Sequence, residues 1–94
     1  MNQVHEQILK TLKDKGYSQV RRVVAERGFD AEGSPALFVW VLVEDKTNDD
    51  SLRWAKVKPM IDAARSASQD SVDSDVWPYV RVRRNKEFFE IQAA

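Results

Sequence analysis

The chain has 94 residues and a hydrophobic content of 43%, which predicts one small folded domain over residues 1–94 and excludes wholesale disorder. Its 15 basic residues are balanced by 15 acidic ones, so it lacks the basic excess that is typical of dedicated nucleic-acid binders. The sequence contains no cysteine, which excludes a disulfide framework, a thiolate nucleophile and a cysteine-based zinc site.

The beginning of the sequence is amphipathic and has no apolar signal core. The longest apolar run, residues 36–43, is too short to cross a bilayer as a helix. We therefore expect a cytoplasmic protein that makes no contact with a membrane.

Residues 2–15 are predicted to form an amphipathic helix that Asn2 caps. Residues 18–29 follow as a strand that is rich in β-branched residues. Two adjacent arginines, Arg21 and Arg22, break the alternation of this strand, which predicts a β-bulge or an edge position. The apolar stripe of the helix is narrow and consists of Val4, Ile8, Leu9 and Leu12.

The middle of the chain contains a second strand and a second helix. Residues 36–43 are apolar at every position, as expected of a strand that is covered on both faces. A turn over residues 30–35 joins it to the preceding strand. The second helix is predicted to begin at residues 49–51 and to end near Ser68, with a kink or a restart at Pro59.

The third strand is predicted over residues 76–84, where Val80 and Val82 alternate with arginines. Pro78 within this strand favours an edge position, because proline cannot donate a ladder hydrogen bond. Residues 85–94 form a tail that is either flexible or packs on the domain.

Together these elements predict an α+β domain, a two-layer sandwich with helix-strand-strand-helix-strand order. The first two strands are joined by a short turn and should pair antiparallel, whereas the second and third are joined through a helix and should be parallel. The all-apolar second strand belongs in the centre, which gives a three-stranded mixed sheet of order 1-2-3. The crossover helix covers one face of the sheet, and the first helix most simply joins it there.

The other face of the predicted sheet is then left open. Exposed aromatic patches are unusual on monomers, and aromatic residues with arginine are typical of interface hot spots. We therefore predict a small interaction or accessory module that forms a homodimer or docks a partner protein through this face. The predicted interface consists of Phe38, Trp40, Leu42, Trp77 and Tyr79, rimmed by Arg81 and Arg83.

Two alternatives remain open for this face. The tail residues Phe88, Phe89 and Ile91, or the first helix, can fold over it and bury it within one chain. The basic residues 81–86 beside the aromatic rings also resemble the surfaces that bind single-stranded nucleic acid, although the zero net charge and the initial helix disfavour that function.

The sequence contains no recognisable catalytic constellation, so we predict a non-enzyme without cofactor or metal. Asp30 with Glu44, Asp45 and Lys46 resembles the Asp…Glu-x-Lys pattern of restriction-endonuclease-like nucleases. However, the hairpin should hold Asp30 and Glu44 about 30 Å apart, which is too far to share a metal ion.

Other charged residues are also better explained as ordinary surface residues than as parts of a metal-binding or catalytic site. Asp70, Asp73 and Asp75 lack the glycine and glutamate of an EF-hand loop. His5 has no partners for a catalytic triad. At the carboxyl ends of the parallel strands a small hydrolase site is conceivable, but we favour a set of surface ion pairs. The charged residues there are Glu44, Asp45, Lys46, Asp49, Asp50, Arg84 and Lys86.

Overall fold

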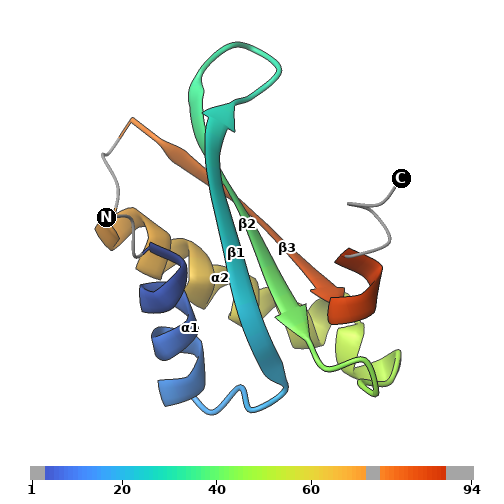
Figure 1. The fold of residues 1–94 in the computed structure, drawn as a ribbon. Coiled ribbons are helices and arrows are strands. Elements are labelled where there is room, and N and C mark those ends of the chain that lie inside the picture. The colour runs from blue at the N-terminus through green and yellow to red at the C-terminus, as the bar shows by residue number, and fades with distance from the viewer. Residues whose placement is uncertain (1–3, 72–74, 89–94) are drawn as a thin grey trace.

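The helices and strands follow one another in the predicted order along the chain (Figure 1). The computed structural model describes residues 4–71 and 75–88, with helical backbone at residues 85–88. The main elements are helix α1 (Val4–Asp14), strands β1 (Val20–Phe29) and β2 (Pro35–Val43), the short 3-10 helix η1 (Asp50–Leu52), helix α2 (Trp54–Ser71) and strand β3 (Trp77–Arg84).

The sheet has the predicted order β1-β2-β3, with β2 in the centre. Strands β1 and β2 pair antiparallel through a hairpin, and β2 and β3 pair parallel across the α2 connection. The α+β class and the mixed three-stranded sheet are therefore confirmed.

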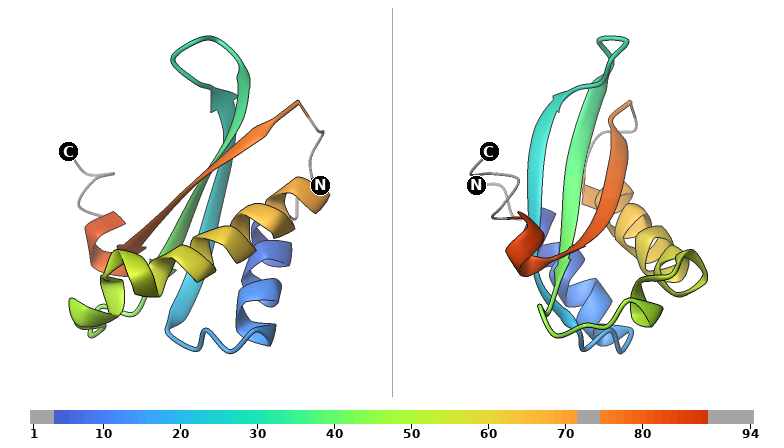
Figure 2. Two further views of the ribbon diagram at one scale, coloured as in Figure 1. Left: turned by 180° about the vertical axis from the view of Figure 1, so that it is seen from behind. Right: turned by 90° about the vertical axis from the view of Figure 1, so that its right-hand side faces the viewer.

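Helices α1 and α2 lie on the same side of the sheet, behind it in Figure 1 and to its right in the second view of Figure 2. They pack on the face formed by the odd-numbered residues of β2. A single hydrophobic core results, and its members include Val4, Ile8, Leu12, Leu37, Val39, Val41, Val43, Met60 and Ala64.

A β-bulge at Arg21 confirms the interpretation of the two adjacent arginines. Val20 pairs with Val43 and Arg22 pairs with Leu42, so Arg21 is the extra residue in β1. The extra residue changes the phase of the strand, which lets both Val20 and Val23 point into the core. Arg22 consequently lies on the opposite face, beside Leu42.

The break predicted at Pro59 lies elsewhere. Pro59 is an exposed residue inside α2, which is one helix from Trp54 to Ser71. The chain restarts instead at Arg53, whose extended backbone (φ −65°, ψ 149°) separates η1 from α2. The missing hydrogen bond at Pro59 falls on the solvent side of the helix, where water can satisfy the freed carbonyl.

The two ends of the chain are described only in part. The proposed cap Asn2 and the tail residues Phe89 and Ile91 lie outside the described residues, as does Asp73. Among the helices of the described part, none is long and apolar enough to cross a membrane.

Candidate interaction face

The sheet face away from α1 and α2, here called the aromatic face, is built from rows of residues that run across the three strands. One row joins Glu26, Phe38 and Tyr79. The next joins Val24, Trp40 and Arg81, and the last joins Arg22, Leu42 and Arg83. Because side chains alternate along a strand, this register brings all seven predicted interface residues, Trp77 included, to one face.

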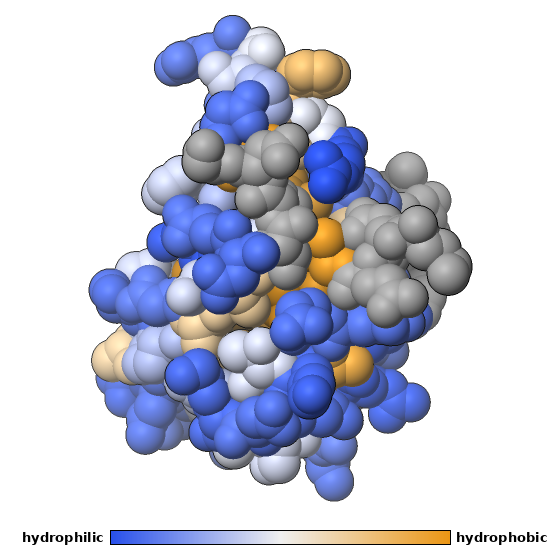
Figure 3. Space-filling model, turned by 90° about the vertical axis from the view of Figure 1, so that its left-hand side faces the viewer, coloured by the Kyte–Doolittle hydropathy of each residue, from blue (hydrophilic) through white to orange (hydrophobic). Residues whose placement is uncertain are grey.

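These residues differ in how far they reach solvent. Trp77 is 47% exposed and Tyr79 37%, whereas Phe38 and Trp40 are half-buried. Leu42 is 0% exposed, so the expectation that it lies open to a partner is wrong. Figure 3 looks at the β1 edge of the sheet, where hydrophobic surface lies between largely hydrophilic side chains.

The side chain of Phe88 covers the Leu42 end of the aromatic face. Its ring meets the Trp40 indole edge-on, with 5.5 Å between the ring centroids, and it is only 5% exposed. The Arg22 guanidinium lies 5.8 Å from the centroid of the same ring. The predicted alternative, in which tail residues fold over the face, is therefore confirmed for one residue, Phe88, at the Leu42 end of the face.

The other end of the face contains a hollow of about 310 Å³. The Phe38 and Tyr79 rings stack along one side of it, 5.7 Å apart between centroids. Gly28 lets the Phe38 ring lie close to β1, since a Cβ there would approach the ring to 3.1 Å. The hollow is lined by Glu26, Phe38, Val39, Trp40, Tyr79 and Arg81.

Two arginines pack against the tryptophans of this face. The Arg81 guanidinium lies 5.8 Å from the Trp40 ring centroid, and that of Arg65 lies 5.3 Å from the Trp77 ring centroid. Arg65 also donates to the carbonyl of Pro78 at 3.4 Å. Such cation–π contacts hold the indoles in place while leaving their other surfaces available.

A hydrogen bond ties the hairpin loop to β3 at the top of the aromatic face. The Tyr79 hydroxyl donates to Asp30 Oδ2 at 3.2 Å, and the amides of Ser34 and Glu32 donate to Asp30 Oδ1. The Ser34 amide is the main reason that the pKa of Asp30 lies below its ordinary value. Desolvation, with a smaller contribution from Asp30, raises the pKa of Tyr79.

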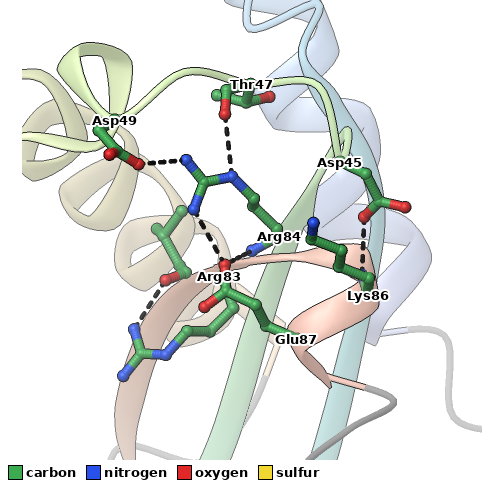
Figure 4. Close-up of polar contacts among 8 residues, drawn as sticks. Asp45, Thr47, Asp49, Arg83, Arg84, Lys86 and Glu87 are labelled. Carbon is green, nitrogen blue, oxygen red and sulfur yellow. Dashed lines mark hydrogen bonds and ion pairs between the residues drawn. The ribbon is translucent and has the colours of Figure 1, made fainter.

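At the opposite end of the sheet, Arg84 holds three segments together (Figure 4). Its Nε donates to the carbonyl of Thr47 at 2.9 Å, and its two terminal nitrogens bind Asp49 and Glu87. Asp49, and then Glu87, raise the pKa of Arg84 further above its ordinary value, against the effect of desolvation. The expected ion pairs thus include a half-buried arginine with a structural role.

The loop after β2 also fixes residues 85–88. Asp45 Oδ1 accepts a hydrogen bond from the backbone amide of Lys86 at 2.7 Å, and Glu87 Oε1 accepts one from the amide of Arg84. These contacts satisfy amides at the start of the helical turn, as a helix cap does. The turn is held where Phe88 reaches Trp40.

The residues of the nuclease-like pattern lie far apart, as the hairpin predicts. Asp30 lies in the hairpin loop, whereas the amide of Glu44 bonds to Gln19 at the opposite end of β2 (Figure 1). Within residues 4–71 and 75–88, no cluster of three His, Asp or Glu residues is placed to hold a metal ion. His5 lies on the surface beside Glu6, with 3.9 Å between Nε2 and Oε1.

Sequence reasoning missed two parts of this face. The position of Glu26 in the hollow was not predicted, because the face of β1 on which its side chain lies depends on where the bulge at Arg21 falls. The Asp30–Tyr79 hydrogen bond joins residues on a loop and a distant strand, for which the sequence carries no local signal. Comparison of the chain with protein-family models, curated proteins and solved structures found no match.

Proposed function

We propose that this chain is a small interaction module that self-associates through its aromatic face. The observation that carries the proposal is the hollow, which places one acidic and one basic side chain on opposite sides of half-exposed aromatic rings. Glu26 stands on β1 and Arg81 on β3, with Phe38 and Trp40 between them on β2. Neither charged residue has an ion-pair partner among the described residues.

A second copy of the chain complements this arrangement of charges. Two sheets that face each other about a two-fold axis parallel to β2 place β1 of one copy opposite β3 of the other. Glu26 of each copy then approaches Arg81 of its partner, and the two Trp40 side chains meet near the axis. A two-fold interface uses the same patch twice, so each favourable pair is made twice. A two-fold axis perpendicular to the strands would instead bring β1 against β1 and β3 against β3, which would separate Glu26 from Arg81 of the partner copy.

The residue types on this face suit such a contact. Tryptophan, tyrosine and arginine are the side chains that most often dominate binding energy at protein interfaces. Burial of the remaining exposed surface of Trp77, Tyr79 and Trp40 would add apolar free energy of about 25 cal/mol per Å². The zero net charge of the chain places no overall repulsion between two copies.

The substitution Trp40→Glu tests the proposal by light scattering. A carboxylate in the middle of the face would be buried without a partner, so the dimer should convert to a monomer. Phe29→Glu is the matched control, because Phe29 is 71% exposed at the end of β1 and lies on the face of that strand opposite to Glu26. A molecular mass that stays the same for the wild type and Trp40→Glu would remove the proposal.

The same face is less suited to single-stranded nucleic acid. Glu26 and Asp30 place negative charge beside Phe38 and Tyr79, where a phosphate backbone would have to pass. We expect no quenching of tryptophan fluorescence by an oligonucleotide at low salt. Saturable quenching that salt abolishes would favour nucleic-acid binding over self-association.

A further inference from the structure

A second apolar groove, here called the edge groove, runs between the free edge of β3 and the start of α2. It has a volume of about 250 Å³ and lies on the helix side of the sheet. Trp54 lines the groove and is largely exposed, whereas Val57 and Ile61, which also line it, are buried. Its lining residues are Leu52, Trp54, Val57, Ile61, Val80, Arg81, Val82 and Arg83.

The backbone of β3 beside this groove has hydrogen-bonding groups directed away from β2. The carbonyl of Pro78 accepts from Arg65, the carbonyl of Val82 from Arg83, and the amide of Arg84 donates to Glu87. All three belong to even-numbered residues and are bound by side chains rather than by β2. Because backbone groups alternate along a strand, the amide and carbonyl of Val80 face outward as well.

This outward edge has no strand partner in the described part of the chain, since β3 is the last strand of the sheet. Arginine side chains bind the carbonyls of Pro78 and Val82, but within residues 4–71 and 75–88 no side chain or loop engages the amide or carbonyl of Val80 on this outward edge. An unpaired edge beside an apolar groove is the arrangement that binds extended peptides by strand addition.

We propose that the edge groove binds an extended acidic peptide, which adds to the sheet beside β3 and inserts an apolar side chain next to Trp54. Charge selects this partner, because the lining includes Arg81 and Arg83 and no acidic residue. Arg83 has no ion-pair partner among the described residues, and its guanidinium lies at the edge, where it donates to the Val82 carbonyl at 2.7 Å. An acidic side chain of the peptide would bind Arg83 as the peptide backbone takes over the strand edge.

The test is an NMR titration of the ¹⁵N-labelled chain with a synthetic peptide, Glu-Asp-Val-Thr-Val-Asp-Glu. The expected result is saturable shifts of the Val80 and Val82 amides and of the Trp54 indole. A peptide with lysine at every acidic position should bind about tenfold more weakly or worse, because it places cations beside Arg83. Equal binding of the acidic and basic peptides, or no shift at β3, would overturn the proposal.

Two surface variants locate the binding site. Trp54→Ala removes an exposed apolar side chain from the groove and Arg83→Glu reverses the charge at position 83, and each should weaken binding of the acidic peptide about tenfold. Unchanged binding in both variants would overturn the proposal. Trp40→Glu, on the opposite face, should bind the peptide as the wild type does, so failure of the edge groove and failure of self-association give different results.

Discussion

At the scale of single residues, the hydrogen bond from Tyr79 to Asp30, which ties the hairpin loop to β3, can be tested directly. Removing the hydroxyl in Tyr79→Phe should raise the pKa of Asp30, while the Ser34 and Glu32 amides keep it below its ordinary value. The carboxyl titration of Asp30, followed by ¹³C NMR, measures this change. An identical titration in the wild type and the variant would show that the hydroxyl does not act on Asp30.

The sign of the accompanying effect on stability follows from linkage. The folded pKa of Asp30 lies below its unfolded value, so its contribution is present above the ordinary carboxyl pKa and is lost as pH falls through the folded pKa. In Tyr79→Phe that contribution should be smaller and should disappear at a higher pH. Urea unfolding between neutral and acidic pH measures the difference.

A second residue-scale prediction concerns the cap provided by Asp45. Asp45→Ala removes the acceptor of the Lys86 amide and should lower the free energy of unfolding by about 1 kcal/mol. Asp45→Asn keeps a side-chain oxygen in the same place and should lose much less. Equal losses in urea unfolding of the two variants would show that the cap does not hold the turn.

At the scale of elements, the bulge in β1 sets which side chains reach the core. Deletion of Arg21 would remove the bulge and restore regular alternation, and Val20, now 2% exposed, would stay paired with Val43 on the core face because it then lies two residues before Val23. We therefore expect the deletion to change the free energy of unfolding little. The control Arg21→Ser keeps the bulge and should also cost little. A loss of about 2 kcal/mol in the deletion variant, the value of burying one valine, would show that Val20 had left the core and would contradict the assigned role of the bulge.

At the scale of the whole molecule, the sheet could be predicted because its determinants are local. The uninterrupted apolar run of β2 requires a central position, and the lengths of its two connections fix the antiparallel and parallel pairings. Alternation also assigned Phe38, Trp40 and Tyr79 to one face. These conclusions need only periodicity and chain connectivity.

The covering of Leu42 could not be predicted in the same way. Phe88 reaches the aromatic face because Asp45 and Arg84 hold the turn that carries it, through contacts between segments distant in sequence. The prediction of a kink or a restart at Pro59 was wrong for a related reason. Its effect depends on which side of α2 it occupies, and the restart at Arg53 carries no proline or glycine signal.

The measurement that tests self-association most directly is a charge exchange between Glu26 and Arg81, followed by sedimentation velocity. Glu26→Arg and Arg81→Glu should each give a monomer, because each places like charges opposite one another in the two-fold contact. The combined variant should restore the dimer that we expect of the wild type, and Arg27→Glu, on the other face of β1, should leave it intact. A combined variant that stays monomeric, single variants that dimerise as the wild type does, or a wild type that is monomeric at every concentration would each contradict the account.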